Sequence, residues 1–268
     1  MSNVDLSGKA AIVTGGADGI GLASAERMAQ LGARVMLVDI DADKLDAAVS
    51  RMKALGHEVV GQHADVSDEG DVRAYVEAAK SHFGRIDGFF NNAGIIPRYY
   101  GVLWDCPADD FDRTIAVNVR GVFLGLKYVI PVMIAQGGGA IVNTASMGAA
   151  GGIPGSSPYV ASKHAVVGLT KNAALEAATA KVRVNAVLPG NIVTRMSGLG
   201  TPGEKANQER LAAMVPAGHM GMPSDIAEAV CFLMSDAATY ITGIELPVDG
   251  GILAASYGNM FNISRPEN

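Results

Sequence analysis

Short apolar runs rich in β-branched residues alternate along most of the chain with segments of helical periodicity. A run at 10–14 is followed by a glycine-rich turn, and apolar residues then recur at helical spacing from about 20 to 31. Strands separated by helices imply a mainly parallel sheet that is covered on both faces. We therefore predict a doubly wound, three-layer α/β/α domain. Strands are expected at 10–14, 34–38, 58–64, 86–91, 140–144, 182–187 and 244–248, and helices at 20–31, 45–55, 69–83, 109–135 and 158–179.

Length and composition favour one large domain. The chain has 268 residues, of which 49% are hydrophobic, and this is enough apolar material for a large core. No linker, repeat or low-complexity segment divides it, so 1–268 is expected to be a single domain. The segment 191–221 lacks clear strand character, and long irregular segments in compact domains are often functional. We expect a substrate lid at 191–221; the alternative is a surface excursion that serves only packing.

Charge and cysteine usage narrow the class of protein further. The net charge is −6 and no basic run occurs, so neither nucleic acid nor an anionic membrane is an expected partner. Cys106 and Cys231 are too few for a disulfide framework. The first nine residues contain no signal segment. The apolar stretch 121–135 is interrupted by Lys127 and Pro131 and is shorter than the about 20 residues that span a bilayer. We expect a soluble cytoplasmic protein.

The turn after the first predicted strand has the composition of a phosphate-binding loop. It contains Gly15, Gly19 and Gly21 and leads directly into a predicted helix. Such glycines permit a tight turn and a close approach of the backbone to a phosphate, and a helix N-terminus presents free N–H groups to a pyrophosphate. Strand, glycines and helix together predict dinucleotide binding, although the spacing differs from the commoner G-x-G-x-x-G pattern.

Acidic residues near this loop indicate which dinucleotide binds. Asp39 ends the second predicted strand, where a carboxylate accepts hydrogen bonds from the adenosine ribose hydroxyls and repels a 2′-phosphate. Asp18 lies inside the loop itself, and no Arg or Lys is adjacent to either carboxylate in the sequence. NAD is therefore expected rather than NADP. The alternative role for Asp39 is a helix cap, which Asp41 could serve instead.

Polar residues also follow the third and fourth predicted strands, at the carboxyl edge where such sheets bind ligands. Asp65 is placed to bind the adenine amino group, with Val66 against the ring. The run 91–94, Asn-Asn-Ala-Gly, suits a close approach of the cofactor. A structural turn that uses the asparagine side chains explains this run equally well.

Tyr159 and Lys163 are four residues apart in a predicted helix and so share one face. A free tyrosine has a pKa of about 10, and a nearby positive charge stabilises the phenolate and lowers that pKa. The pair therefore suggests proton transfer to or from a hydroxyl or carbonyl oxygen.

Taken together, these motifs closely resemble those of the short-chain dehydrogenase/reductase family over roughly residues 6 to 254. The resemblance implies a Rossmann-type fold and hydride transfer with a nicotinamide cofactor. By this resemblance, the three-residue gap between Tyr159 and Lys163 favours alcohol and carbonyl chemistry over enoyl reduction. It rests on Thr14-Gly15-x-x-x-Gly19-x-Gly21, Asp39, Asp65, Asn91-Asn92-Ala93-Gly94, Asn118, Ser146, Tyr159-x-x-x-Lys163, Pro189-Gly190 and Thr194.

The resemblance implies specific catalytic roles. Tyr159 would be the acid/base, and Lys163 would lower its pKa and hold the nicotinamide ribose. Ser146 would hydrogen-bond the substrate oxygen, and Asn118 would hold a water that relays protons from Lys163. The alternatives are a turn cap for Ser146 and a buried residue bonded to backbone for Asn118.

The same resemblance extends the cofactor site to the sixth strand, where Pro189, Gly190 and Ile192 would line the nicotinamide and Thr194 would bind its carboxamide or the phosphates. The expected cofactor-binding residues are Gly15, Asp18, Gly19, Ile20, Gly21, Asp39, Ile40, Asp65, Val66, Asn92, Ala93, Gly94, Tyr159, Lys163, Pro189, Gly190, Ile192 and Thr194. No group of residues has metal-ligand spacing, so no metal is expected.

The substrate is less constrained than the cofactor. The expected pocket residues are mostly apolar: Ile95, Ile96, Trp104, Met147, Ile153, Asn191, Met196 and Leu199. An apolar pocket suits a hydrophobic secondary alcohol or cyclic ketone; the exceptions near it are Arg98, expected in solvent, and Arg195. Two alternatives remain, a ketone or 3-oxoacyl reductase that works in the reductive direction and a non-catalytic NAD-binding protein. The resemblance implies a homotetramer or homodimer, and the tail 252–268 either reaches a neighbouring site or frays.

Overall fold

The computed structural model describes residues 4–196 and 205–255. In this part of the chain, seven parallel strands form one sheet in the order β3-β2-β1-β4-β5-β6-β7. The predicted doubly wound α/β/α architecture is thus confirmed. The strands are β1 Ala10–Thr14, β2 Arg34–Asp39, β3 Val59–His63, β4 Gly88–Asn91, β5 Gly139–Thr144, β6 Val182–Pro189 and β7 Glu245–Val248.

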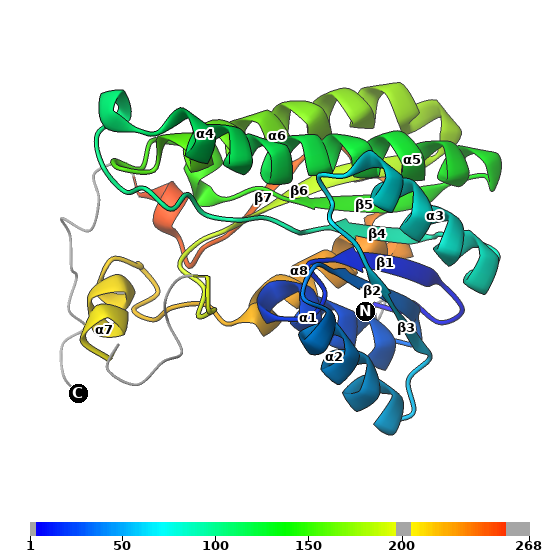
Figure 1. Ribbon diagram of the computed structural model, residues 1–268. Helices are drawn as coiled ribbons and strands as arrows, with labels where there is room; N and C mark the ends of the chain where they lie inside the picture. Colours follow the sequence, from blue (N-terminus) through cyan, green and yellow to red (C-terminus); the bar gives the residue numbers. More distant parts are fainter. Residues whose placement is uncertain (1–3, 197–204, 256–268) are drawn as a thin grey trace, which may run out of the picture.

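Helices cover both faces of the sheet (Figure 1). Alternate residues of each central strand serve the two faces: Ile12 and Phe89 join one hydrophobic cluster with α3, α5 and α6, and Val13 and Phe90 join the other with α1, α2 and α8. Both clusters are fully buried at these strands, which explains the unbroken apolar runs in the sequence. The helices are α1 Gly19–Gln30, α2 Ala42–Ala54, α3 Glu69–Phe83, α4 Ala108–Ile115, α5 Gly121–Ala135, α6 Ser157–Ala177, α7 Lys205–Ala213 and α8 Pro223–Met234.

Several elements differ from the sequence-based expectation. β4 begins two residues later than predicted, because the backbone of Ile86 is bound by the side chain of Gln136, which accepts from its N–H at 3.0 Å and donates to its carbonyl. α8 was not predicted, and α7 lies within the segment expected to be irregular. In Figure 1, α7 stands away from the sheet, beyond the carboxyl ends of the strands.

α4, a π-helical turn at Ala116–Arg120 and α5 join into one helical run, Ala108–Ala135. With 28 residues, this run is long and apolar enough to cross a membrane by length and composition alone. The apolar stretch that was judged too short in the sequence, 121–135, is only 15 residues of it. Its apolar side chains, including Leu126, Val129 and Met133, pack into the core against β4 and β5. One face of the run is therefore buried against the sheet.

The topology reverses between β1 and β4, since β2 and β3 extend to one side of β1 and the later strands to the other. In open parallel sheets, ligands bind at the carboxyl ends of the strands beside such a reversal. A site is therefore expected among the residues that follow β1, β4 and the neighbouring strands β5 and β6.

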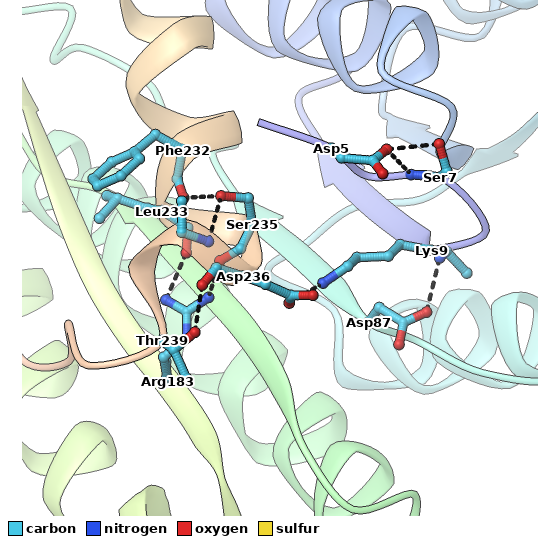
Figure 2. Close-up of polar contacts among 12 residues, drawn as sticks. Asp5, Ser7, Lys9, Asp87, Arg183, Phe232, Leu233, Ser235, Asp236 and Thr239 are labelled. Carbon is cyan, nitrogen blue, oxygen red and sulfur yellow. Dashed lines mark hydrogen bonds and ion pairs between the residues drawn. The ribbon is translucent and has the colours of Figure 1, made fainter. Parts of the chain in front are cut away.

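The opposite, amino edge of the sheet is fixed by polar anchors (Figure 2). Arg183 on β6 donates to the carbonyl oxygens of Leu233 at 2.6 Å and Ser235 at 3.1 Å, where α8 ends. Lys9 pairs with Asp236 on the same turn at 2.5 Å. Burial lowers the pKa of Arg183, but the guanidinium satisfies carbonyls that the helix leaves without intrahelical partners.

We expect Arg183→Met to lower the free energy of unfolding by about 2–4 kcal/mol, because it leaves buried carbonyl acceptors without a donor. Urea denaturation followed by circular dichroism measures the change. Arg85→Met is the matched control on the same edge: Arg85 is half-exposed and pairs with Asp87, so its loss should cost about 0–1 kcal/mol. Equal losses for the two variants would contradict the anchoring role of Arg183.

Candidate active site

The glycine-rich turn after β1 adopts the backbone conformation for which glycine is required. Gly15 and Gly19 have φ values of +63° and +53°, which residues with a Cβ rarely adopt. A Cβ on Gly21 would lie 1.9 Å from the carbonyl oxygen of Gly15. α1 therefore starts tightly against the turn, and its first N–H groups face the carboxyl edge of the sheet, where they can bind a pyrophosphate.

Asp39 ties the end of β2 to the glycine-rich turn. One carboxylate oxygen accepts from the backbone N–H of Ala17 at 3.0 Å, and the other accepts from Asp41 at 3.0 Å. Ile40 beside it is 63% exposed. The helix-cap alternative does not apply to Asp39, since Asp41 caps α2 by accepting from Lys44. Asp39 instead presents a carboxylate at the edge of the predicted adenosine site.

The charge environment of Asp18 differs from the sequence-based expectation that no cation lies close. Asp18 caps α1 by accepting from the N–H of Gly19. Lys44 Nζ lies 3.7 Å from its carboxylate and Arg195 Nη1 lies 3.8 Å from it. Both cations come from segments distant in sequence, so adjacency along the chain could not reveal them. The expectation was wrong, and the adenosine side of the site holds both signs of charge.

The remaining predicted adenine and ribose contacts follow β3 and β4. Asp65 accepts from the backbone N–H and hydroxyl of Ser67 at 2.8 and 2.7 Å, and Val66 is buried beside Gly121. Asn92 binds the carbonyl of Thr14 at 3.0 Å. The asparagine side chain thus joins the ends of β1 and β4, so the structural role that the sequence left open is present.

The backbone N–H groups of Asn92 and Ala93 both donate to the Thr14 hydroxyl, at 2.9 and 3.1 Å. A Cβ on Gly94 would lie 3.2 Å from Asn118 Oδ1 and 3.5 Å from Lys163 Nζ. The space that a side chain would fill in front of the lysine is therefore kept open. An uncrowded cradle beside an ammonium fits the ribose of a nicotinamide cofactor.

Ser146, Tyr159 and Lys163 meet at the carboxyl end of β5. Ser146 follows β5 and hydrogen-bonds Tyr159, and its Oγ also accepts from the N–H of Gly148 at 3.1 Å, which is the turn cap considered in the sequence. Tyr159 and Lys163 lie one turn apart on α6, with the ammonium 5.6 Å from the phenol ring centroid. Lys163 is 4% exposed and donates to the carbonyl of Thr144 at 2.7 Å. The three side chains thus converge as the family resemblance implies.

The pKa of Tyr159 moves in the direction opposite to the sequence-based expectation. Burial raises the pKa of Tyr159, and the hydrogen bond from Ser146 opposes that shift only in part. Lys163 does not offset the burial, because its ammonium binds the Thr144 carbonyl and because burial lowers its own pKa to about 8. In the protein alone, Tyr159 is therefore a protonated phenol at neutral pH, suited to donate a proton to a substrate oxygen.

The buried charge of Lys163 leads to a stability prediction. Its pKa is about 8 in the folded protein against 10.5 for a free lysine, so the unfolded chain binds the extra proton between these values and wild-type stability rises with pH there. The free energy of unfolding of Lys163→Met relative to wild type should therefore be about 2 kcal/mol higher at pH 7 than at pH 9.5, because the lost hydrogen bond to the Thr144 carbonyl costs the same at both pH values. Urea denaturation at the two pH values tests this.

The control is Lys127→Met. Lys127 is half-exposed and pairs with Glu69, which raises the pKa of this lysine. Its replacement should therefore stabilise the protein at neither pH. A stabilisation of Lys163→Met that is independent of pH would contradict the assignment of the effect to the buried charge.

Asn118 lies in the π-helical turn, fully buried. Its side chain accepts from the N–H of Ile95 at 2.8 Å and donates to the carbonyl of Ile95 at 2.9 Å and to Ser162 Oγ at 3.0 Å. The backbone-bonded alternative is thus the observed state of the side chain. Any water that relays protons at this position would have to use the backbone.

The residues after β6 lie over the glycine-rich turn. Gly190 donates to the carbonyl of Val248 at 3.1 Å, directly after Pro189 ends the strand. Ile192 is buried and forms an isolated parallel bridge with Gly221. The Thr194 methyl group lies 3.6 Å from the Cβ position of Gly19. Thr194 therefore packs directly against the start of α1, beside the glycine-rich turn where a pyrophosphate would bind, and Ile20 is half-buried at the same helix start.

The structure places the expected pocket residues unevenly. The Ile153 side chain reaches to 3.0 Å from the Cβ position of Gly148, which is itself 3.6 Å from Ser146 Oγ. Met147, next to Gly148, is half-buried, and so is Ile96 in the segment after β4. Asn191 binds the carbonyl of Leu211 on α7 at 3.3 Å. Trp104 is 83% exposed and Met196 47% exposed, so neither closes a pocket within the described chain. Leu199 and the rest of 197–204 lie outside the described residues, as does 256–268 of the tail.

Comparison with known proteins identifies the family of the chain. Residues 15–253 match the family model described as enoyl-(acyl carrier protein) reductase. Levodione reductase of Leifsonia aquatica is 43% identical over 91% of this chain and 94% of its own, and a crystal structure of levodione reductase superposes with a TM-score of 0.89 at 42% identity, over 93% of this chain and 99% of that one.

Two further relatives show the range of the family. Cyclohexanol dehydrogenase of an Acinetobacter species is 38% identical over 93% of this chain and 96% of its own. The NADH complex of 3-ketoacyl-(acyl-carrier-protein) reductase from Brucella melitensis has a TM-score of 0.86 at 37% identity, over 92% of this chain and 99% of that one. The chain belongs to the short-chain dehydrogenase/reductase family and is an oxidoreductase.

Proposed function

We propose that this protein is an NAD-dependent dehydrogenase that converts a hydrophobic, cyclic secondary alcohol to its ketone. The observation that carries the proposal is the convergence of Ser146, Tyr159 and Lys163 at the carboxyl end of β5, beside a glycine-rich turn and the carboxylate of Asp39. The relatives named for levodione and cyclohexanol support a cyclic substrate.

In this mechanism, Ser146 hydrogen-bonds the substrate oxygen and orients it toward Tyr159. During oxidation the phenolate of Tyr159 takes the hydroxyl proton, and during reduction the phenol of Tyr159 returns it. When bound, the nicotinamide supplies the acceptor for the hydride of the carbinol carbon, and its positive charge favours the phenolate that the protein alone disfavours. Lys163 is held by the Thr144 carbonyl, where it can bind the nicotinamide ribose.

Residues around the glycine-rich turn would hold the remainder of the cofactor. The N–H groups at the start of α1 bind the pyrophosphate, and Asp39 accepts from the adenosine ribose hydroxyls. Pro189, Gly190 and Ile192 line the nicotinamide from the β6 side, with Thr194 near the phosphates. Two observations support this fit of the cofactor: Gly94 leaves open the space in front of Lys163, and Thr194 lies close to Gly19 at the start of α1.

The second candidate is an NAD(P)H-dependent 3-oxoacyl or ketone reductase that works in the reductive direction. It is favoured by the raised pKa of Tyr159, which suits proton donation, and by the similarity to the NADH complex of a 3-ketoacyl reductase. We propose a cytoplasmic homotetramer or homodimer in either case, with residues 191–221 as the substrate lid of a single domain.

The test follows absorbance at 340 nm with NAD and separately with NADP. The panel contains cyclohexanol, cyclohexanediols, sugars and steroids for oxidation, and cyclohexanone and an acetoacetyl thioester for reduction with NADH and NADPH. We expect NAD-dependent oxidation of cyclic alcohols. Turnover of only the acetoacetyl thioester would favour the second candidate, and NADH binding without turnover of any compound would reject both.

A further inference from the structure

The segment Ile95–Tyr100 follows β4 and is held by side chains of one helical run through its backbone. Asn118 bonds both the N–H and the carbonyl of Ile95. Asp110 Oδ2 accepts from the N–H of Arg98 at 2.7 Å and of Tyr99 at 2.9 Å. Arg113 adds a bond to the carbonyl of Ile96 at 3.1 Å. Because these bonds hold the backbone, they fix the path of the segment whatever its side chains are.

We call the side chains of Asp110, Arg113 and Asn118 that hold this segment the clamp. Asp110 and Arg113 are its charged pair. Asp110 is 5% exposed, and its second oxygen accepts from Arg113 Nε at 3.3 Å and Nη2 at 3.1 Å. The N–H of Tyr99, the hydrogen bonds of Arg113 and the N–H of Arg98 hold the pKa of this carboxyl below its usual range. Both oxygens are therefore engaged, and an amide cannot replace the carboxylate without placing a donor against a donor.

The clamped segment ends beside the catalytic tyrosine. Gly101 donates to the carbonyl of Gly155 at 3.3 Å, in the loop that precedes α6. At the other end, Asn118 donates to Ser162 Oγ, which donates to the carbonyl of Tyr159 at 2.7 Å. The charge of a Tyr100 phenolate would raise the pKa of Tyr159, so the two phenols lie within electrostatic range.

Tyr100 is the exposed residue at the end of this segment. Its side chain is 61% exposed, and within residues 4–196 and 205–255 its hydroxyl makes no hydrogen bond. The candidate pocket is otherwise apolar on this side, where Ile96 belongs to the same clamped segment. A phenol free to donate and accept, held at a fixed place near the acid/base, suits an oxygen of the substrate other than the one that reacts.

We propose that Asp110 and Arg113 are positioning residues that fix Tyr100 beside Tyr159, and that Tyr100 selects cyclic alcohols with a second oxygen. The inference rests on the proposed function and names its substrate class more narrowly. Asp110 acts through Tyr100 and not on the reacting atoms.

The experiment compares cyclohexanol with the three cyclohexanediols as substrates, using wild type, Tyr100→Phe, Asp110→Asn and the double variant. We expect Tyr100→Phe to lower kcat/KM for the preferred diol about three- to tenfold through KM, since one neutral hydrogen bond is lost, and to leave cyclohexanol unchanged. Asp110→Asn should act in the same direction, and the double variant should lose less than the product of the two factors.

Asp87→Asn is the matched control. Asp87 also accepts from a backbone N–H, that of Ala10 at 2.9 Å, and pairs with Arg85, but it lies at the amino edge of the sheet (Figure 2). It should leave the KM of all four alcohols unchanged. If Asp110→Asn does not fold, the comparison of Tyr100→Phe with wild type on cyclohexanol and the diols tests the inference by itself.

Equal losses on cyclohexanol and the diols, or no loss on any diol, would overturn the inference while the proposed function stands. Absence of turnover on all four alcohols by the wild type would reject the proposed function and the inference with it.

Discussion

Tyr159→Phe should abolish most of the alcohol oxidation while retaining most of the cofactor affinity, because the proposed cofactor contacts lie mainly on the start of α1, Asp39 and Lys163. The substitution keeps the ring against its neighbours and removes only the hydroxyl that Ser146 hydrogen-bonds. General acid–base catalysis contributes about 10²–10⁴-fold, so kcat/KM for the preferred alcohol should fall by that factor. Absorbance at 340 nm gives the rate, and NADH fluorescence titration gives the affinity.

Tyr128→Phe is the matched control for this variant. Tyr128 also donates its hydroxyl to a partner, Glu69, at 2.8 Å, but this bond joins α5 to the start of α3. It should retain the wild-type kcat/KM. A Tyr159→Phe variant within a few-fold of wild type would show that another group transfers the proton, and the proposed chemistry would have to be abandoned.

The sequence predicts the framework of this protein well because of how its strands are buried. Each central strand packs on two hydrophobic clusters, so apolar residues occupy both faces and the run is unbroken; Phe89 and Phe90 are an example. α8 was missed although its start carries two signals, since Pro223 is its first residue and Asp225 lies in its first turn. Only its N-cap, Met222, is atypical.

The sequence alone could not predict contacts between segments that are distant along the chain. The ion pairs of Asp18 with Lys44 and Arg195 join the glycine-rich turn to α2 and to the segment after β6, and only the fold brings these three together. The Asp110 clamp is similar, because a carboxylate that binds backbone N–H groups leaves no pattern in the residues it binds. Its one available signal was an acidic residue at the start of a predicted helix, which an ordinary helix terminus explains equally well.

The direction of the pKa shift of Tyr159 is a second property that the sequence alone could not predict. The spacing of Tyr159 and Lys163 correctly places both on one face of α6, but the sign of a pKa shift depends on burial and on what the ammonium binds. Lys163 faces the Thr144 carbonyl, and both groups are desolvated. A tyrosine–lysine pair in sequence therefore predicts proximity, whereas the protonation state follows from the environment.

Asp39→Ser should shift the cofactor preference from NAD toward NADP. The carboxylate is the proposed acceptor for the ribose hydroxyls, and charged hydrogen bonds contribute about 1.5–3 kcal/mol, so kcat/KM with NAD should fall about 10- to 100-fold. Loss of the negative charge also removes the repulsion of a 2′-phosphate, and kcat/KM with NADP should rise. Initial rates with both cofactors at saturating alcohol give the ratio.

The control must separate charge from local structure, because Asp39 also accepts from Ala17 and Asp41. Asp41→Ser removes a carboxylate two residues away and retains an N-cap side chain for α2, so it should leave the ratio near the wild-type value. Equal shifts in both variants would mean that the turn and not the charge of Asp39 selects the cofactor. Wild-type preference for NADP would instead assign the phosphate to Lys44 and Arg195, which already balance Asp18 at this edge.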